Sequence, residues 1–472
     1  MPYADLREFL AKLDAAGKLH RIKQAVDKDW EIAAIARIAF QAIPEPKRPA
    51  LLFENVKGFS EPVVLGVNGA SRAIYCLALE CELGEVQKKW SEAELRPIAP
   101  VRIERGPVQE NIFIGDAADV TRLPIPTWTV GQDPAPYITA GSVITRDPDT
   151  GVRNVGTYRV EVKQARKLGL FINYLQGGRE HVEKNNRAGK ATPVAIVMGT
   201  EPVVGLVSVS RVQAGTDELA VAGRLRGEAV QVVRCQTVDL EVPASAEVVI
   251  EGVVRANELE NEGPFGEYTG YMGPAAMSYV VDVTCVTHRN QPIVQAFLSQ
   301  MPPSESSCIR SIGREATLLK HLKEDLRLPV RDVHLLEHSG AAAYLVISMK
   351  KTHPVQPRTA MFAAWAYAPQ FGKFTVVVDE DIDVRDPNEV NWALAFRVQP
   401  AADAFIMPGT AAVSLDPSQA ASDVRQEEST RRMSSKIGID ATRKHAFPPL
   451  ALPPGEHLEK VRAQWKKYGF GA

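Results

Sequence analysis

The sequence predicts an α+β protein in which a β-rich central part is flanked by two parts that mix helices and strands. Two observations support this prediction. Short apolar runs bounded by Gly, Pro or Asn are frequent between residues 109 and 310, and such runs are typical of strands. On either side, similar runs alternate with stretches whose apolar residues recur at the spacing of an amphipathic helix. We therefore expect an N-terminal α/β domain (1–108), a β-rich domain (109–310), a C-terminal α/β domain (311–440) and a tail (441–472).

The N-terminal part begins with a predicted helix. Apolar residues recur on one helical face between Leu6 and Leu13, and Gly17 then supplies a C-cap. Mixed helix and strand follow, with buried strands expected at 50–53 and 63–67, since both runs are apolar and bounded by turn-forming residues.

The central part contains many short runs that suit strands. The predicted strands are 157–162, 194–198, 203–209, 247–255 and 279–286. The run 247–255 gives the clearest signal, because apolar and charged residues alternate along it. The run 279–286 is followed by a turn-forming segment and then by 293–297, which predicts a hairpin.

The final third again alternates helices with strands, as α/β units do. The predicted helices and strands are, in order, 314–326 (helix), 343–349 (strand), 358–368 (helix) and 374–378 (strand). A further helix is predicted after Asp386, a good N-cap residue, with Pro387 at its first position. The tail is rich in proline and charge and is expected to pack on a partner subunit.

Composition excludes several classes of protein. The net charge is −2 and no basic stripe occurs, which argues against nucleic acid as a partner. The longest apolar stretch, 341–349, is far shorter than the roughly 20 residues of a membrane span, and the N-terminus lacks a signal pattern. The five cysteines form no Cys-x-x-Cys pair, which suits a reducing compartment. A cytoplasmic protein without a membrane span is expected.

Two glutamates lie at the ends of the segment 262–267, whose sequence is EGPFGE. Its glycines and proline predict a shaped loop on which Glu262 and Glu267 can approach each other. Carboxylates that share a site have pKa values pushed apart, so that one is protonated and the other ionised. A solvated acidic turn is the alternative, but the aromatic residues Tyr268 and Tyr271 that follow favour a pocket wall.

Two further groups of polar residues could carry chemistry. Arg159 can bind a carboxylate or phosphate bidentately, although an exposed arginine on a surface strand is the better interpretation of that residue alone. Strict alternation places Asn154 on the opposite face, so a shared site requires a bulge or a strand end. Asp379, Asp381 and their acidic neighbours follow a predicted strand and could hold Mg2+, but we prefer a solvated connection.

Taken together, several segments resemble the UbiD family of decarboxylases, which use prenylated flavin mononucleotide (FMN). The segments that carry the resemblance are 154–159, 242–247, 262–271, 378–381 and 435–442. The resemblance implies a central split β-barrel of the flavin-reductase type, flanked by N-terminal and C-terminal α/β domains. It also implies a homodimer or a dimer-based higher oligomer.

The resemblance assigns roles to residues of this sequence. Arg159, Glu262 and Glu267 match the catalytic network of the family, in which Glu267 returns a proton and Glu262 holds the arginine. Asn154 and Glu218 match ligands of a divalent metal, Mn2+ or Mg2+, with K+ also implied. The residues expected to line the cofactor are Thr157, Tyr158, Arg159, Gln176, Gly177, Val207, Ser208, Ser210 and Lys436, the last at the phosphate.

Gln176 stands where many family members have a metal-binding histidine. An amide oxygen suits Mg2+ or Mn2+ but is weaker than imidazole for softer metals. Gln176 is therefore expected either to complete the metal site or to contact the flavin, and the identity of the metal stays open.

The implied activity is the reversible, non-oxidative decarboxylation of an aromatic or heteroaromatic acid, free or as its acyl-CoA form, with CO2 as product. A flavin prenyltransferase would supply the cofactor. Apolar segments at 295–303 and 361–365 are candidate walls for a flat substrate. The alternatives are a non-catalytic flavin-binding protein and a flavin oxidoreductase on the same barrel, but neither explains a complete set of Arg159, Glu262 and Glu267.

Overall fold

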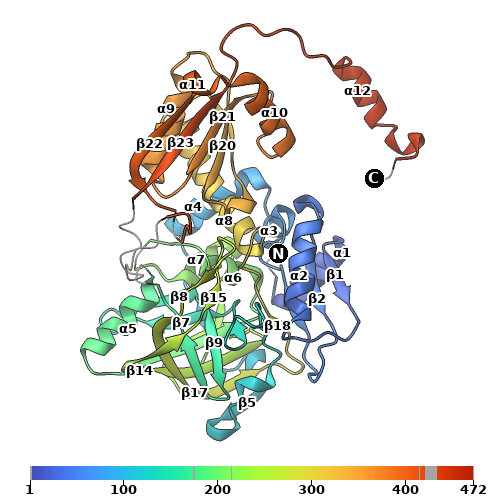
Figure 1. Ribbon diagram of the computed structural model, residues 1–472. Coiled ribbons are helices and arrows are strands. Elements are labelled where there is room, and N and C mark those ends of the chain that lie inside the picture. Colours follow the sequence, from blue (N-terminus) through green and yellow to red (C-terminus); the bar gives the residue numbers. More distant parts are fainter. Residues whose placement is uncertain (1–2, 174–175, 214, 414, 420–432, 471–472) are drawn as a thin grey trace.

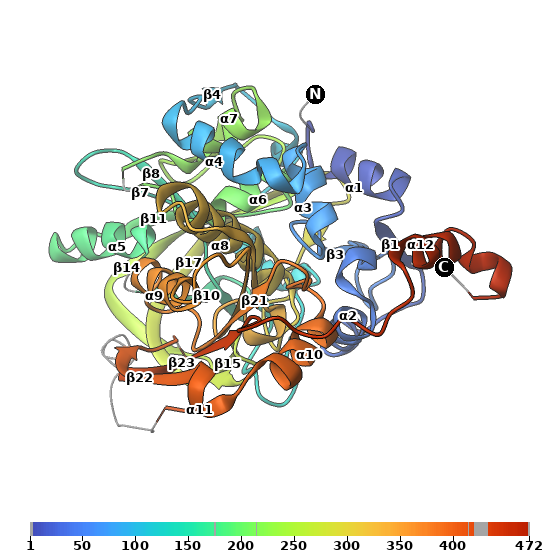
Figure 2. The ribbon, with the colours of Figure 1, turned by 90° about the horizontal axis from the view of Figure 1, so that it is seen from above.

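The computed structural model describes residues 3–173, 176–213, 215–413, 415–419 and 433–470 (Figure 1). Within these ranges the strands form a central sheet of nine, a C-terminal sheet of five, an N-terminal sheet of four, and two smaller sheets. Figures 1 and 2 show the N-terminal part beside the central sheet, with the C-terminal sheet as a separate layer joined to both through α8 (Glu305–Lys320).

The N-terminal part has the predicted first helix and both predicted strands. Helix α1 (Leu6–Ala15) buries its apolar stripe, and Gly17, with φ of +65°, follows its end. The sheet has the order β1-β2-β3-β18. Its strands and the nearby helices are β1 (Leu19–Ile22), β2 (Ala50–Phe53), β3 (Val63–Leu65), β18 (Val294–Gln295), α2 (Glu31–Ala42), α3 (Arg72–Leu79) and α4 (Val86–Leu95).

The central sheet is curled into a half-barrel with the order β6-β9-β10-β17-β14-β11-β7-β8, and β5 pairs with β17. Long strands β14 and β17 form its spine. The strands are β5 (Asn111–Ile114), β6 (Tyr137–Ile138), β7 (Ser142–Arg146), β8 (Arg153–Thr157), β9 (Val160–Gln164), β10 (Lys167–Leu170), β11 (Thr192–Met198), β14 (Val248–Glu262) and β17 (Ala276–His288).

Helices and minor strands accompany the central sheet. They are α5 (Gly177–Arg187), α6 (Pro202–Ser208), α7 (Glu218–Arg226), β4 (Val101–Arg102), β12 (Gln231–Arg234), β13 (Glu241–Pro243), β15 (Phe265–Gly266) and β16 (Met272–Gly273). The core is continuous between the N-terminal part and the central sheet, so these two parts form one packed body.

Three predictions in this region are wrong. The run 203–209 lies mostly in α6, because Pro202 at its first turn starts a helix and a short buried apolar run has no period that separates helix from strand. The run 157–162 is not one strand, since it is broken between β8 and β9. The segments 279–286 and 293–297 do not form a hairpin, because β18 pairs in parallel with β3.

The reason for the missing hairpin lies in Glu247. Its carboxylate accepts a hydrogen bond from the Ile293 N–H at 3.0 Å, and its carbonyl oxygen accepts one from the Arg289 N–H at 3.0 Å. These bonds lead the chain away from β17 and towards the N-terminal sheet.

The C-terminal sheet has the order β19-β20-β21-β23-β22 and a separate apolar cluster on each of its faces. Its elements are β19 (Val330–Leu335), β20 (Tyr344–Met349), α9 (Gln356–Tyr367), β21 (Phe374–Asp379), α10 (Pro387–Arg397), α11 (Pro400–Asp403), β22 (Ala404–Ala411) and β23 (Met433–Ala441). The predicted strands at 343–349 and 374–378 and the helix at 358–368 are present. Asp386 caps α10 as predicted and accepts a hydrogen bond from the Asn388 N–H at 2.8 Å.

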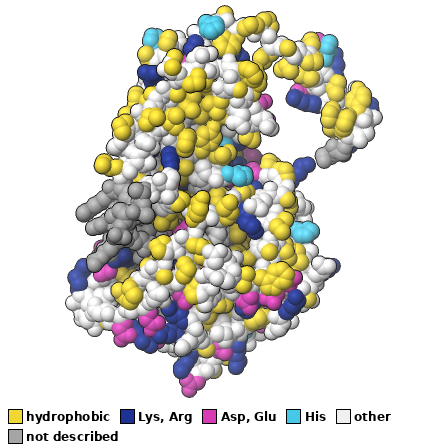
Figure 3. Space-filling model, in the orientation of Figure 1, with side chains coloured by type: hydrophobic (Ala, Val, Ile, Leu, Met, Phe, Trp, Pro, Cys, Tyr) yellow, Lys and Arg dark blue, Asp and Glu magenta, His cyan; other side chains and the backbone are white. Residues whose placement is uncertain are grey.

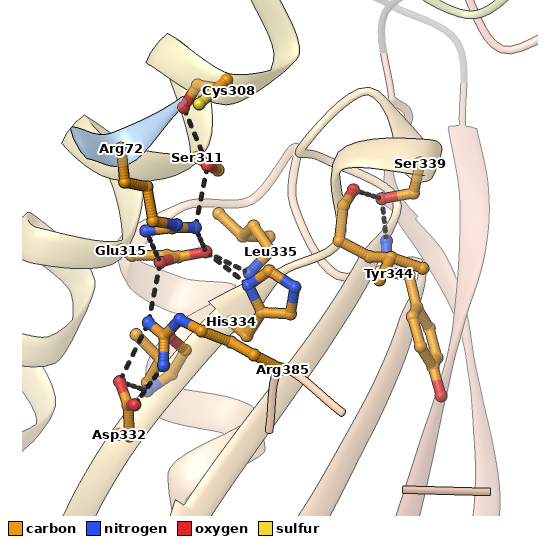
Figure 4. Close-up of polar contacts among 12 residues, drawn as sticks. Arg72, Cys308, Ser311, Glu315, Asp332, His334, Leu335, Ser339, Tyr344 and Arg385 are labelled. Carbon is orange, nitrogen blue, oxygen red and sulfur yellow. Dashed lines mark hydrogen bonds and ion pairs between the residues drawn. The ribbon is translucent and has the colours of Figure 1, made fainter. Parts of the chain in front are cut away.

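Helix α8 connects the C-terminal sheet to the rest of the molecule and continues across residue 310. Glu315 on this helix is the centre of the junction (Figure 4). Its carboxylate accepts hydrogen bonds from Arg72 of α3 at 2.9 Å, from Arg385 at 3.1 Å and from the Leu335 N–H of β19 at 2.9 Å, and it contacts His334 Nδ1 at 2.8 Å. One buried carboxylate on α8 therefore joins the N-terminal part to the C-terminal sheet.

After β23 the chain extends away from the body to α12 (Gly455–Arg462), which buries none of its residues (Figure 1). Figure 3 shows apolar side chains exposed on this arm and over the C-terminal layer. Across the described residues, no helix is long and apolar enough to cross a membrane.

Candidate active site

Arg159 lies in the short link between β8 and β9, where the strand pattern is interrupted. Its Nε and Nη2 donate to the two carboxylate oxygens of Glu262, at 2.9 and 2.8 Å, and its Nη1 donates to Glu267 Oε1 at 2.7 Å. The alternation of side chains along a strand requires a bulge or a strand end if Asn154 and Arg159 are to share a site. The break between β8 and β9 supplies such a strand end. Arg159 is thus held bidentately by one acid while it contacts the second.

The local fold explains how the two acids converge on Arg159. Glu262 is the last residue of β14, and Glu267 follows β15 in a hairpin with β16, where its N–H donates to the Tyr271 carbonyl at 2.9 Å. The guanidinium of Arg159 stacks over Phe171, 4.1 Å from the ring centroid. This stacking fixes the plane of the guanidinium and therefore the direction of its N–H groups.

The two glutamates differ in exposure. The Glu262 side chain is fully buried, whereas 21% of the Glu267 side chain is accessible. Burial raises the pKa of Glu267, and the opposing charges of Arg159 and Arg310 do not cancel this effect. The solvated acidic turn is therefore excluded. Glu267 combines access to a ligand with a raised pKa, which are the properties of a proton donor.

The charge of Arg159 is preserved in this setting. Burial opposes it, but the hydrogen bonds and charge of Glu262, together with Glu267, outweigh burial and raise its pKa. The arginine is therefore a permanent cation that can orient an anionic ligand.

One acid of this region was missed from the sequence. Glu161 in β9 is buried, and its Oε2 accepts a hydrogen bond from the Gly263 N–H at 3.4 Å, on the loop that joins the two catalytic candidates. Burial raises its pKa. Its position between Val160 and Val162 was the available signal, since a charged residue within a buried strand requires a partner.

Asn154, Tyr158 and Gly177 form a second group. Asn154 Nδ2 donates to the Tyr158 hydroxyl at 3.0 Å, and this hydroxyl also accepts from the Gly178 N–H at 3.3 Å. A Cβ atom added to Gly177 would lie 2.4 Å from Asn154 Oδ1. The start of α5 is therefore packed against the amide oxygen of Asn154, and only glycine fits there.

Glu218 begins α7, and its Oε2 accepts a hydrogen bond from the Val155 N–H at 2.9 Å. Burial raises the pKa of Glu218 to about 7. Val155 follows Asn154 directly, so the structure brings Asn154 and Glu218 to the same end of β8.

Gln176 immediately precedes α5, and its Oε1 accepts a hydrogen bond from the Asn173 N–H at 2.8 Å. This bond occupies one acceptor site of the amide and leaves another lone pair on the same oxygen. No group of three or more His, Cys, Asp or Glu side chains could hold a metal within the part of the chain that is described. A metal site here would therefore need the amide oxygens of Asn154 and Gln176 beside Glu218.

Thr157 and the end of α6 are joined by side-chain hydrogen bonds. Thr157 Oγ1 and Ser208 Oγ are 2.7 Å apart, and Ser208 Oγ also donates to the Gly205 carbonyl at 2.8 Å. Ser210 Oγ donates to the Leu206 carbonyl at 2.8 Å, while Val207 is fully buried. Four of the residues expected along the cofactor, Thr157, Val207, Ser208 and Ser210, thus lie together at the ends of β8 and α6.

Lys436 lies elsewhere, on β23 of the C-terminal sheet. Its Nζ donates to the Phe371 carbonyl and lies 5.9 Å from the centroid of the Trp365 ring. Burial lowers its pKa to about 8. Among the described residues, no hydrogen bond or ion pair joins Lys436 to the central sheet.

Two other expectations concern the C-terminal part. Asp379 and Asp381 accept hydrogen bonds from the buried Arg397, at 2.8 and 2.9 Å, so the acidic segment serves a salt bridge rather than an open metal site. In the segment 361–365, Met361 and Trp365 are buried in the core of the C-terminal sheet and do not line a pocket, whereas Phe362 is exposed.

Comparisons with known proteins agree with this architecture. Models of the 3-octaprenyl-4-hydroxybenzoate carboxy-lyase family match three stretches: the N-terminal domain at 10–94, the Rift-related domain at 100–302 and the C-terminal domain at 307–441. An uncharacterized protein of Synechocystis sp. is 32% identical over 500 residues, which cover 99% of this chain and 96% of that protein.

Solved structures of decarboxylases are also similar to this chain over nearly its whole length. The UbiD-class enzyme HmfF from Pelotomaculum thermopropionicum, in complex with FMN, is 36% identical with a TM-score of 0.85, covering 97% of this chain and 99% of that chain. An evolved dimeric form of HmfF in complex with prFMN is 37% identical, with a TM-score of 0.83 and the same coverage. Vanillic acid decarboxylase from Sedimentibacter hydroxybenzoicus is 30% identical, covering 99% of this chain and 100% of that chain, with a TM-score of 0.82 for its open form and 0.77 for its closed form.

The central sheet forms a half-barrel, and the similar proteins of known activity are decarboxylases. This protein is therefore a carboxy-lyase. The chain belongs to the UbiD family.

Proposed function

We propose that this enzyme catalyses the reversible, non-oxidative decarboxylation of an aromatic or heteroaromatic carboxylic acid with the help of prenylated FMN. The observation that carries the proposal is the contact of one arginine, Arg159, with both a fully buried and a partly accessible carboxylate. The relatives that bind FMN or prFMN, and those named for aromatic acids, support the choice of cofactor and substrate class.

The residues present fit a divalent metal and a flavin. Glu218 is a buried carboxylate that forms no ion pair within the described residues, and a bound cation would remove the cost of its charge. We propose that Asn154, Glu218 and Gln176 hold Mn2+ or Mg2+ near the flavin phosphate, with K+ nearby. Thr157, Tyr158, Gly177, Val207, Ser208 and Ser210 would line the cofactor.

When bound, prenylated FMN supplies the electrophilic centre that accepts the electron pair released with CO2. Arg159 orients the carboxylate of the substrate by charge and hydrogen bonds. Glu262 keeps the guanidinium in its plane, because it occupies Nε and Nη2. Glu267 donates a proton to the carbon from which CO2 has departed, and it can do so because its pKa is raised and its side chain is accessible.

Lys436 is proposed to reach the flavin phosphate in a second arrangement of the C-terminal layer. The relative with open and closed forms supports this step, since this chain has the higher TM-score with the open form. The separate core of the C-terminal sheet would allow such a movement without breaking the main core.

The substrate is proposed to be a free acid or its acyl-CoA form, and a flavin prenyltransferase is the proposed source of the cofactor. The proposed domains are 1–108, 109–310, 311–440 and the tail 441–472. We also propose a homodimer or a dimer-based oligomer, for which the dimeric form of HmfF is the precedent.

The proposal is tested with Glu267→Gln in enzyme co-expressed with a flavin prenyltransferase. We expect the variant to keep its bound flavin and to lose CO2 release and solvent-deuterium exchange by at least about 100-fold, the usual scale of general acid catalysis. Glu258→Gln is the matched control, because Glu258 is an exposed acid on the same strand β14.

Three results would contradict the proposal. Full turnover in Glu267→Gln would remove Glu267 from its role. Bleaching of the flavin by NAD(P)H would indicate a reductase, and a bound flavin without CO2 release from any aromatic acid would indicate a binding protein.

A further inference from the structure

A second buried acid lies directly behind the pair of Arg159 and Glu262. Glu161 of β9 and Glu262 lie against the same residue of β10, since a Cβ atom added to Gly169 would be 3.4 Å from Glu161 Cβ and 3.4 Å from Glu262 Cγ. Both acids are buried. Two carboxylates that share a buried site repel each other when both are ionised, so one of them is expected to hold a proton.

The contacts of the two acids indicate which of them holds this proton. Both oxygens of Glu262 accept hydrogen bonds from Arg159, at 2.9 and 2.8 Å. Within the described part of the chain, the Glu161 carboxyl accepts a single hydrogen bond, a long one of 3.4 Å from the Gly263 N–H. The guanidinium therefore favours the ionised form of Glu262, and the proton is left to Glu161.

A lysine beside Glu161 weakens this preference without reversing it. Lys163 Nζ is 3.8 Å from Glu161 Oε2 and also 3.8 Å from Glu260 Oε2, so its charge is divided between two acids. Burial raises the pKa of Glu161, the charge of Lys163 opposes this effect and the charge of Glu262 adds to it, so that the pKa is raised on balance. Another titratable neighbour, Tyr137 of β6, stays neutral because burial raises its pKa as well.

Glu161 and Tyr137 also hold the loop that carries the proton donor Glu267. Tyr137 stands opposite Glu161 in the pairing of β6 with β9, and its ring packs on Phe265 with the centroids 4.3 Å apart. Phe265 and Gly263 both belong to this loop, which therefore has one aromatic and one polar contact with the strands behind it. A shift of either strand would change the distance between the acids of the site.

We propose that Glu161 is a positioning residue, which carries a proton in the working enzyme and holds the loop at Gly263 so that the two acids of the site stay on Arg159. The inference rests on the proposed function, because these two acids are the ones assigned to orientation and proton transfer. An ionised Glu161 would place a second negative charge behind Glu262 and compete with it for the guanidinium.

The test compares substitutions in the holoenzyme. Glu161→Leu leaves the buried Gly263 N–H without its acceptor, so kcat should fall about 10-fold or more with little change in KM. Glu161→Gln keeps an acceptor oxygen and lacks the charge, so it should restore most of the lost kcat. Glu260→Gln is the matched control, because it neutralises the other acid beside Lys163, and kcat should stay within about 2-fold.

Infrared spectroscopy detects the proton without turnover. At neutral pH the protein should show the carbonyl band of a buried, protonated carboxylic acid, which is lost in Glu161→Gln and kept in Glu267→Gln and Glu260→Gln. If Glu161→Gln removes no such band, or if it lowers kcat more than about 10-fold while it retains its flavin, Glu161 acts through its charge and the inference is overturned. The band without CO2 release from any aromatic acid would support the proton on Glu161 and contradict the proposed function.

Discussion

Glu218 is a buried carboxylate whose protonation should be coupled to the binding of the proposed metal. Burial raises its pKa from 4.5 to about 7, so the folded protein holds a proton that the unfolded chain releases. Stability should therefore fall as pH rises from about 4.5 to about 7, by roughly 3 kcal/mol at most. A divalent cation would replace this proton, and its stabilising effect should be larger above pH 7 than below pH 5.

This coupling can be measured with Mn2+ and thermal unfolding. We expect millimolar Mn2+ to raise Tm more at pH 8 than at pH 5, and Glu218→Gln to abolish both the Mn2+ effect and the associated pH dependence. Glu258→Gln, on an exposed site, should retain them. An unchanged Mn2+ shift in Glu218→Gln would show that the metal is not bound there.

At the scale of elements, the site depends on two interruptions of the central sheet. The break between β8 and β9 presents Arg159, and the start of α5 presses on Asn154 through Gly177. These positions were unexpected from periodicity alone, because a run such as 157–162 has the composition of a continuous strand. Tertiary packing overrode that local preference.

Gly177→Ala tests the contact between α5 and β8. The added methyl group would lie 2.4 Å from Asn154 Oδ1, so the amide oxygen must move. We expect metal affinity to fall at least about 10-fold, measured by Mn2+ titration, the scale seen when the surroundings of a metal ligand are disturbed.

Gly313→Ala in α8 is the control for the same chemical change. A Cβ atom at Gly313 meets nothing within 4 Å, so this variant should gain up to about 1 kcal/mol from helix propensity and bind metal normally. Equal metal affinity in both variants would exclude a role for the α5 contact.

At the scale of the whole molecule, the ion cluster around Glu315 connects the N-terminal part to the C-terminal sheet (Figure 4). Burial alone would raise the pKa of Glu315, but the hydrogen bond with His334 and the charges of Arg72 and Arg385 hold it at about 2. Its stabilising contribution is therefore present above pH 4.5 and is lost as pH falls towards 2, by roughly 3 kcal/mol.

Glu315→Gln should be strongly destabilising at pH 7, because it leaves the Arg72 guanidinium without its ion-pair partner and leaves Arg385 with Asp332 alone. We expect a loss of roughly 3–5 kcal/mol in urea unfolding and a flatter stability profile between pH 4.5 and 2. Asp116→Asn removes a surface ion pair with Arg166 and should change stability by less than about 1 kcal/mol. Equal effects of the two changes would contradict the central role of Glu315.

The tail makes a second prediction at this scale. Helix α12 buries no residue, and Trp465, Tyr468 and Phe470 beyond it are all about half exposed. A short isolated helix is marginal in water, so a second copy of this chain is the proposed partner. Removal of residues 451–472 should convert the oligomer into smaller species in light scattering, and an unchanged mass would place the interface elsewhere.

The sequence by itself determined the β-rich centre, the mixed flanking parts, the capped helices α1 and α10, and the membership of a decarboxylase family. These features depend on local periodicity, capping residues and short motifs, which can be recognised from the order of residues in the sequence. Only the tertiary structure decided that most of 203–209 is helical, that β18 joins the N-terminal sheet, and that Lys436 lies in the C-terminal layer. It also revealed Glu161, because the cost of a buried polar group depends on what surrounds it in three dimensions.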